Sequence, residues 1–443
     1  MNFNLDLNTD KLISDLENIS LYKRFGMVNR VIGLIIESEG PNVNVGEVCI
    51  IKPGVDNQTV RAEVVGFKDN KVLLMPLGDM KGIGPGCRVI PTGEPLKVKV
   101  CDDMLGTVLN GLGETMDGFN FDNQTYQQLP IYNNPPDPLK RERITETVAL
   151  GVRSMDGLLT CGKGQRLGIF AGSGVGKSTL MGMIARNTNA DINVIALIGE
   201  RGREVKDFIE GDLGEDGLKK SVVVVATSDQ PALIRLKGAF VATTIAEYFR
   251  DQGNDVMLMM DSVTRFAMAQ REVGLAVGEP PATRGYTPSV FALLPKLMER
   301  AGTNDKGTIT GLYTVLVEGD DMNEPIADAA RSILDGHIVL SRDLAAQNHY
   351  PAIDVLESVS RLMTELADDN HKRAANKMRE VLATYEESKD LVNIGAYERG
   401  SDPKLDYALD KLDEINDFLR QDIDESSSYQ ETVDWLTNIF SGE

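Results

Sequence analysis

The chain has 443 residues, 42% of them hydrophobic, which suits a globular protein with two or three domains and a sizeable core. Its formal net charge of −21 disfavours a surface that depends on binding nucleic-acid phosphates. No apolar run is long enough to span a membrane, and the N-terminus lacks the pattern of a secretory signal, so we expect a cytoplasmic protein. The four cysteines are too widely spaced for a zinc site and too few for a disulfide framework, and we expect buried thiols.

Residues 1–25 contain the pattern of one short amphipathic helix. Thr9 can cap its N-terminus, and Leu12, Leu16 and Ile19 follow at the spacing of a single apolar stripe. Two interpretations remain open: a helix packed on the chain's own barrel or frayed in solution, and a docking helix for a partner protein. The acidic residues of this segment disfavour a helix that lies on an anionic membrane surface.

Residues 26–93 predict a small β-barrel, because short β-branched runs recur between turn signals. The runs are Val28–Ile36, Val48–Ile51, Val60–Val65 and Val72–Met75. Asp69 and Asn70 lie between the last two runs and are typical of a hairpin turn. No pattern here indicates catalysis, so we expect this part to serve assembly.

We expect residues 94–150 to form a turn-rich connector. Four prolines fall between Pro130 and Pro138 and exclude a continuous helix there. We place a domain boundary near Pro95.

Residues 151–350 alternate apolar strands with helical patterns, which predicts a mostly parallel sheet with helices on both faces. The predicted strands are Arg166–Phe170, Asn193–Ile198, Ser221–Ala226, Asp255–Met260 and Thr310–Val317. The predicted helices include Leu180–Asn187, Gly202–Gly211 and Pro231–Gln252.

The stretch from Ala171 to Thr179 reads AGSGVGKST and lies between the first of these strands and the first helix. It matches the phosphate-binding P-loop, with Ala171 at the position usually held by the first glycine. Its glycines allow the backbone amides to turn inward at a helix N-terminus, where they favour an anion. We expect the following residues to contact a nucleotide: Gly172, Ser173, Gly174, Val175, Gly176, Lys177, Ser178 and Thr179.

Two carboxylates follow other strands of the same sheet. Asp261 ends a buried strand and is placed to hold Mg²⁺, usually through its waters; the alternative is a strand-end carboxylate that caps a turn. Glu200 can act on a water near the terminal phosphate as a general base, or simply orient it. Because Arg201, Arg203 and Glu204 follow closely, a structural ion-pair cluster is the alternative for Glu200.

From the residues alone, Tyr350 is a half-buried aromatic before a proline turn, and Arg361 is one candidate partner for a carboxylate. Residues 351–443 predict a charged helical domain with breaks at Gly395 and Gly400. Its helical patterns run over Arg373–Ser388 and Leu405–Gln421. We expect Asp422–Ser428 to be a solvated loop without a function.

Several motifs occur in a fixed order along the chain: LGTVLNGLGETMDG, AGSGVGKST, ALIGERGREV, MLMMDSVTRFA, GEPPATRGYTPSVF, DDMNEPIADAARSILDGHIVLSR and HYPAIDVLESVSRLM. Together they resemble the rotary-ATPase-like export ATPases, and most closely the flagellum-specific ATPases of type III export. The resemblance extends from about Phe25 to the C-terminal helices.

The resemblance implies a RecA-like P-loop NTPase core of α/β class with an N-terminal β-barrel and a C-terminal helical domain. The corresponding parts are a docking helix and linker at 1–25, the barrel at 26–93, the connector and ATPase domain at 94–365, and the helical domain at 366–443. It also implies a homohexameric ring that binds ATP with Mg²⁺ at each subunit interface.

For individual residues, the resemblance assigns Lys177 and the P-loop amides to the phosphates. It assigns Ser178 and Asp261 to Mg²⁺ and Glu200 to the catalytic water. Other matching positions are Arg201 and Arg265 near the site, Tyr350 against adenine, and Arg361 as an arginine finger that acts on the neighbouring subunit's nucleotide.

The leading hypothesis is ATP hydrolysis that energises flagellar type III protein export by unloading substrates from their chaperones. Its implied partners are further copies of the chain, a stalk protein, a negative regulator and chaperoned substrates, without nucleic acid, at the inner face of the cell membrane. Four alternatives remain: the ATPase of a virulence injectisome, a catalytic subunit of a rotary ATP synthase, an RNA-translocating hexameric ATPase and a non-enzymatic ring scaffold.

Overall fold

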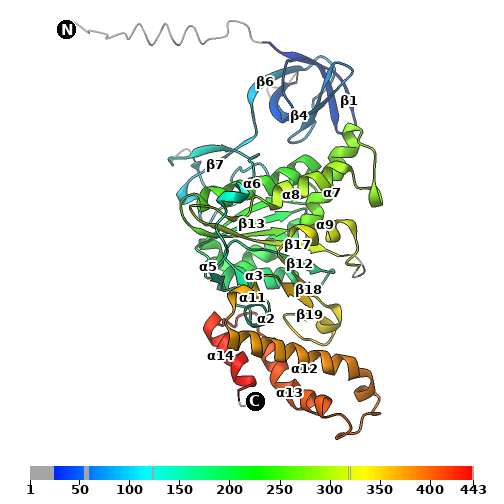
Figure 1. Cartoon of the computed structure of the whole chain (residues 1–443). Helices are drawn as coiled ribbons and strands as arrows, with labels where there is room; N and C mark the ends of the chain where they lie inside the picture. The colour runs from blue at the N-terminus through cyan, green and yellow to red at the C-terminus, as the bar shows by residue number, and fades with distance from the viewer. Residues whose placement is uncertain (1–23, 54–58, 122–123, 318, 320, 442–443) are drawn as a thin grey trace, which may run out of the picture. The chain divides into compact units, whose positions relative to one another are not determined.

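The structure of the chain is a computed structural model, and it describes residues 24–53, 59–121, 124–317, 319 and 321–441 (Figure 1). The chain divides into two compact units between Leu96 and Lys97. The apolar stripe of the helix predicted within residues 1–25 lies outside the described residues. Among the residues that are described, every helix is too short or too polar to cross a lipid bilayer.

The first unit is a closed β-barrel, as the sequence predicts. Its strands follow the order β1, β2, β5, β4, β3, β6, and the neighbouring strands pair antiparallel. Their bounds are β1 Gly26–Ile32, β2 Ile35–Glu39, β3 Glu47–Lys52, β4 Val60–Lys68, β5 Lys71–Pro76 and β6 Arg88–Pro95. Side chains such as Ile36, Ile51 and Val64 are completely buried and form the barrel core.

One detail of the barrel differs from the prediction, and another confirms it. The run Val28–Ile36 is not one strand: the chain turns at Gly33, which has a φ of +54°, and the run is shared between β1 and β2. Asp69 and Asn70 form the predicted hairpin turn between β4 and β5, with φ angles of 49° and 62°. Two consecutive positive φ angles fit the right-handed twist of the flanking strands.

The second unit contains a nine-stranded sheet in the order β19, β18, β12, β17, β15, β13, β14, β8, with β16 added beside β17. All neighbours from β18 to β8 are parallel, while β19 and β16 pair antiparallel. The five predicted strands are confirmed, each within two residues of its bounds. The bounds are β8 Val108–Asn110, β12 Arg166–Ala171, β13 Ile192–Ile198, β14 Ser221–Ala226, β15 Asp255–Asp261, β16 Gly302–Thr303, β17 Thr308–Leu316, β18 Gly336–Leu340 and β19 Ile353–Ser360.

Helices cover both faces of this sheet, as predicted: α6, α7 and α8 lie on one side, and α3 and α5 lie on the other (Figure 1). Their bounds are α3 Lys177–Asn187, α5 Gly214–Lys219, α6 Ala232–Arg250, α7 Val263–Val277 and α8 Pro288–Met298. The helix predicted over Gly202–Gly211 is α4 Gly202–Asp207, which continues as a π-helical segment, Phe208–Leu213. Shorter helices are α2 Arg153–Leu158, α9 Pro325–Ile333, α10 Arg342–Ala346 and α11 Met363–Leu366.

The connector contains only short elements. Among its described residues, these are β8 of the large sheet, β7 Lys97–Val100, β9 Gln127–Pro130, β10 Thr147–Val148 and three-residue 3₁₀ turns. Between Pro130 and Pro138 the chain forms no α-helix, as the prolines predict. All four cysteines are free thiols and buried, as expected, and Cys161 lies in β11, Cys161–Gly162.

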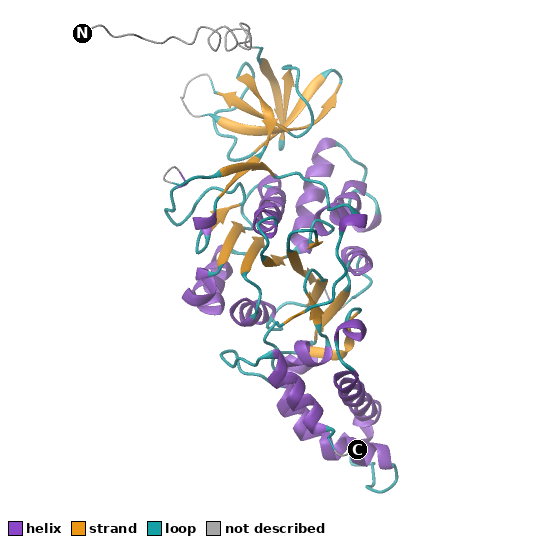
Figure 2. Cartoon of the chain, turned by 60° about the vertical axis from the view of Figure 1, so that its left-hand side comes forward, coloured by secondary structure: helices purple, strands orange, loops and turns teal. Residues whose placement is uncertain are grey.

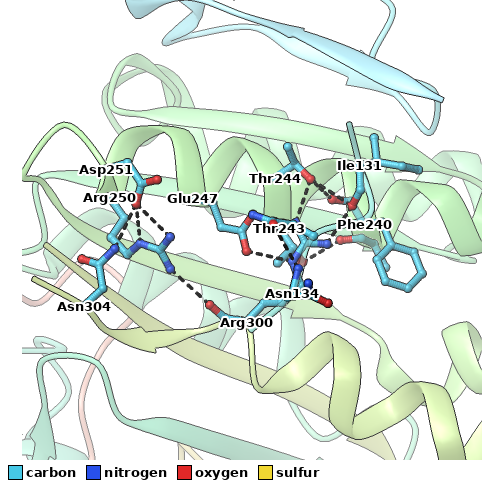
Figure 3. A network of polar contacts seen from close by, with 12 residues as sticks. Ile131, Asn134, Phe240, Thr243, Thr244, Glu247, Arg250, Asp251, Arg300 and Asn304 are labelled. Carbon is cyan, nitrogen blue, oxygen red and sulfur yellow. Dashed lines mark hydrogen bonds and ion pairs between the residues drawn. The ribbon is translucent and has the colours of Figure 1, made fainter. Parts of the chain in front are cut away.

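A buried polar network ties the connector to the sheet unit (Figure 3). Arg300, which is completely buried, donates to both oxygens of Glu247 at 2.8 and 2.7 Å and to the hydroxyl of Thr244 at 2.9 Å. Its third contact is the carbonyl of Ile131 in the connector, at 2.7 Å. A guanidinium out of water requires such partners on all sides, so the network fixes this part of the connector on α6.

The C-terminal region is helical, as predicted (Figure 2). It consists of α12 Asp369–Asn393, α13 Pro403–Leu419 and α14 Tyr429–Ile439. Gly395 and Gly400 lie in the break between α12 and α13. α14 was not among the predicted helical patterns, although Ser428 and Glu431 form the capping box that marks its start. All three helices contribute buried side chains to the core that also holds the sheet strands.

Candidate functional site

The motif AGSGVGKST takes the predicted order of strand, loop and helix. β12 ends at Ala171, the loop contains the positive φ angles of Gly174 and Gly176, and α3 begins at Lys177. Gly176 occupies the N-cap with a φ of 88°, which a side chain would strain. The free amides of the first helical turn therefore face the loop, where they favour an anion.

Three charged side chains meet beside this loop: one at the start of α3 and two at or just after strand ends. The Lys177 ammonium contacts Oδ1 of Asp261 at the end of β15, and it lies 3.7 Å from Oε1 of Glu200, which follows β13. Thr314 of β17 donates to the same Oδ1 of Asp261 at 2.6 Å. The parallel order of β17, β15 and β13 explains the convergence, because the carboxyl ends of parallel strands meet at one edge of a sheet.

Glu200 has the most perturbed electrostatics of this group. Burial, and then the negative charge of Asp261, raise the pKa of Glu200 to about 7, against the opposing charge of Lys177. Its Oε1 is buried without a hydrogen-bond partner among the described residues. A carboxyl group with these properties changes its protonation state near neutral pH, which suits a group that handles a proton.

The structural alternative for Glu200 was an ion-pair cluster with its arginine neighbours. Arg201 pairs with Glu204 at 3.2 Å, and Arg203 pairs with Asp207 at 3.4 Å, both on the exposed side of α4. Within the described part of the chain, the ion pair of Glu200 is with Lys177 instead. The cluster therefore exists and reaches Glu200 through a hydrogen bond with Glu204, while the ion pair with Lys177 links Glu200 to the P-loop.

The residues predicted to bind phosphates line one cleft of about 900 Å³. The predicted residues in its lining are Gly172, Ser173, Gly174, Gly176, Lys177, Ser178, Thr179, Glu200, Arg201 and Arg265. Two predicted residues lie just behind this surface: Val175 is 2% exposed and packs in the core, and Asp261 is 3% exposed.

Tyr350 lies in a second cleft, of about 890 Å³, that shares Gly174, Gly176 and Thr179 with the first. A side chain placed on Gly176 would have its Cβ 3.5 Å from Cε1 of Tyr350, so the tyrosine ring lies directly over the P-loop. A nucleotide with its phosphates on the loop therefore has an aromatic surface within reach of its base.

The segment Asp422–Ser428, expected to be a solvated loop without a function, contributes to this second cleft. Asp422, Ile423 and Glu425 line it together with Trp435 of α14. Glu425 is held by an ion pair with the buried Arg153, whose guanidinium lies 4.8 Å from the ring centre of Trp435. Residues 422–428 form a mostly exposed loop, as expected, and the contact that anchors this loop was not predicted because Arg153 is distant from it in sequence.

Arg361 is not brought to either cleft of its own chain. It follows β19, is exposed, and uses its backbone amide to donate to the carbonyl of Asp335 at 3.1 Å. It lies close enough to His337 to help lower the pKa of that imidazole, of which burial is the main cause. Any action of Arg361 on a nucleotide thus requires a second copy of the chain.

Several site residues were missed from the sequence. Arg271, Arg284, Tyr286, Glu324 and Arg342 also line the first cleft. The position of Arg342 could have been predicted, because this residue follows β18, which pairs with the P-loop strand β12. Its guanidinium packs so closely on Gly172 that a Cβ at that position would lie 2.6 Å from Nη2. Arg271 comes from α7 and Glu324 from the N-cap of α9, whereas Arg284 and Tyr286 come from the segment between α7 and α8, and their approach to the cleft depends on the tertiary fold.

Comparisons with known proteins agree with this geometry. Three family models match: the ATP synthase alpha/beta family β-barrel domain over 28–93, its nucleotide-binding domain over 151–360, and the T3SS EscN ATPase C-terminal domain over 367–438. The flagellum-specific ATP synthase of Bacillus subtilis is 56% identical over 438 residues, which cover 99% of this chain and 100% of the relative. The type 3 secretion system ATPase of Xanthomonas euvesicatoria is 52% identical, with 96% of each chain covered.

Among solved structures, the assembled ATPase EscN in complex with its central stalk EscO, from enteropathogenic E. coli, superimposes with a TM-score of 0.87. It is 47% identical, and the match covers 94% of this chain and 100% of that one. Fold, motif order and near full-length identity agree. The chain therefore belongs to the ATP synthase alpha/beta family and is an ATPase of the branch that contains the flagellum-specific and type III secretion proteins.

Proposed function

We propose that this chain hydrolyses ATP with Mg²⁺ to energise flagellar type III protein export, by unloading substrates from their chaperones at the export gate. The observation that carries the proposal is the convergence of Lys177, Asp261 and Glu200 where the P-loop meets the N-terminus of α3. A phosphate-binding lysine, a strand-end carboxylate and a second carboxylate near neutral pKa are the groups that nucleotide hydrolysis requires.

Lys177 and the loop amides bind the outer phosphates, and Tyr350 packs on the base. Ser178 and Asp261 hold the Mg²⁺ ion. Their donors fit that ion, because Mg²⁺ takes one or two protein oxygens and otherwise keeps waters and substrate phosphates. When bound, the ion neutralises charge on the phosphate oxygens.

Glu200 orients the attacking water and accepts its hydrogen bond. The ionised carboxylate is the active form, and its pKa of about 7 lets it take up a proton near neutral pH. Arg361 supplies the remaining positive charge from a neighbouring copy in a homohexameric ring, in which Arg201 and Arg265 belong to the nucleotide's own subunit. Such a ring is supported by the assembled state of the EscN relative.

The proposed partners are further copies of this chain, a stalk protein, chaperoned substrates and a negative regulator. The EscN relative, solved with its central stalk, supports a stalk partner. We place the protein in the cytoplasm, in peripheral contact with the inner face of the cell membrane. Nucleic acid is not a partner, in keeping with the net charge of −21.

An injectisome ATPase is the second candidate, because a type 3 secretion relative is 52% identical and a flagellar relative 56%. Deleting the chromosomal copy distinguishes the two. Loss of flagellar filaments supports the flagellar system, while normal filaments with loss of another secreted set support the injectisome.

The direct test of the enzyme is Lys177→Ala in the full chain. The variant should lose Mg²⁺-dependent ATP hydrolysis while it keeps the circular dichroism spectrum of the wild type. Export should fail in cells that carry only this variant. Normal turnover by Lys177→Ala would refute the proposed site, and stimulation of the wild type by added RNA would favour a translocase instead.

A further inference from the structure

Thr314 is a completely buried residue between the P-loop strand and the strand that carries Asp261. In the parallel pairing of β12 with β17, Ile169 lies opposite Thr314, and the pairing of Met260 with Tyr313 brings Asp261 beside Thr314. The Thr314 hydroxyl lies 2.6 Å from Oδ1 of Asp261 and 3.4 Å from the carbonyl of Met260. The shorter contact shows that its proton is donated to the carboxylate.

The neighbours of Thr314 on the same sheet face are apolar. Ile169 is opposite it on β12, Leu312 is two residues earlier on β17, and Leu197 pairs with Asp261 from β13. All three are buried in the main core. A hydroxyl in such a layer costs free energy unless it is hydrogen-bonded, and a valine would fill the space equally well. The carboxylate of Asp261 is what makes a polar residue favourable here.

Asp261 has two donors on the same oxygen, and they differ in mobility. Lys177 reaches Oδ1 with a long, flexible side chain, whereas Thr314 is fixed by strand pairing on both sides. The hydroxyl of Thr264 also holds the end of β17, because the amide of Leu316 donates to Oγ1 of Thr264 at 2.9 Å. If Lys177 leaves Asp261 to bind a phosphate, the hydrogen bond from Thr314 to Asp261 therefore remains.

We propose that Thr314 is a positioning residue for hydrolysis: its hydroxyl holds Oδ1 of Asp261 and so fixes the carboxylate that would hold the Mg²⁺ ion. The inference rests on the proposed function, since that function assigns Asp261 to the metal. Groups that orient a metal-binding carboxylate commonly change metal affinity or activity by roughly 10- to 100-fold when removed.

The test compares Thr314→Val, which keeps the shape but lacks the hydroxyl, with Thr314→Ser, which keeps the hydroxyl. Thr310→Val is the matched control: it removes a buried hydroxyl four residues earlier on the same strand, which accepts from the amide of Gly164 at 2.9 Å. Each full-length variant is titrated with a fluorescent N-methylanthraniloyl ADP, once with Mg²⁺ and once with EDTA. The Mg²⁺ concentration for half-maximal ATP hydrolysis is measured in parallel.

We expect Thr314→Val to lose most of the affinity that Mg²⁺ adds for the ADP probe, and to need roughly 10- to 100-fold more Mg²⁺ for half-maximal turnover. Its affinity in EDTA should equal that of the wild type. Thr314→Ser should restore the Mg²⁺ response, and Thr310→Val should leave it unchanged. If Thr314→Val does not fold, as judged by circular dichroism, Thr314→Ala replaces it in the same comparison.

A wild-type Mg²⁺ response in the valine variant would overturn the proposal, and so would an equal loss in Thr310→Val, because both would make the hydroxyl merely structural. A wild-type chain without Mg²⁺-stimulated hydrolysis would instead overturn the proposed function, and this inference with it.

Discussion

The protonation of Glu200 predicts how turnover depends on pH. The pKa of an ordinary glutamate is 4.5, and in this site burial and the charge of Asp261 raise it to about 7. The ionised carboxylate is the form that accepts a hydrogen bond from the attacking water. Turnover is therefore low when the pH lies below the raised pKa, and it increases as the pH passes through that value.

The size of the effect follows from the shifted value. With a pKa of about 7, roughly a tenth of Glu200 is ionised at pH 6 and roughly nine tenths at pH 8, so kcat/KM should increase about tenfold over this interval. With the ordinary value of 4.5 the group would be ionised throughout, and the increase would be negligible. The two cases are easy to distinguish.

The assay measures kcat/KM for ATP from pH 6 to pH 8 with Mg²⁺ in excess and at constant ionic strength, because kcat/KM reports groups of the free enzyme. Glu200→Gln should have little activity and no titration. In Glu204→Gln the midpoint should move to lower pH, since the hydrogen bond that protonated Glu200 donates to the ionised Glu204 contributes to the raised pKa of Glu200. A flat profile for the wild-type chain would refute the reasoning about Glu200.

Three further predictions concern other parts of the structure. Arg361→Ala should keep ATP affinity and lose most hydrolysis, and loss of binding alone would indicate a structural role. Glu247→Ala removes the carboxylate that pairs with the buried Arg300, so the free energy of unfolding measured by chemical denaturation should decrease by about 3–5 kcal/mol. Asp216→Ala, which removes an exposed ion pair, should leave the free energy of unfolding unchanged. Tyr350→Ala should raise the KM for ATP roughly tenfold or more at unchanged kcat, and Tyr350→Phe should restore it; an unchanged KM in the alanine variant would contradict base stacking.

Much of the fold could be predicted because the buried strands of a parallel sheet are continuous apolar runs. β14, for example, agrees with its predicted bounds, Ser221–Ala226, and all its residues are buried. β18 and β19 were missed because they contain polar residues such as His337 and Asp354, and β19 also lies at the sheet edge. The turn at Gly33 was missed because the apolar character continues through it.

Site residues could be predicted only where a local sequence motif, or the position at the end of a strand, indicates their chemical role. The P-loop and the strand-end acids Glu200 and Asp261 follow from local order, because parallel strands bring their carboxyl ends together. The contribution of Thr314 depends on the register between β15 and β17, which no local pattern states. The side of the second cleft that Ile423 and Trp435 line depends on how the C-terminal helices pack on the sheet unit.

The central claim is that ATP is hydrolysed at a site that two copies of the chain complete, and a mixing experiment tests it most directly. Lys177→Ala and Arg361→Ala are each inactive if the claim holds. After subunit exchange in an equal mixture, about a quarter of the interfaces of a random ring combine an intact Lys177 with an intact Arg361. We expect the mixture to regain about a quarter of the wild-type ATPase activity. A mixture that stays inactive, although mass measurement shows mixed rings, would contradict it.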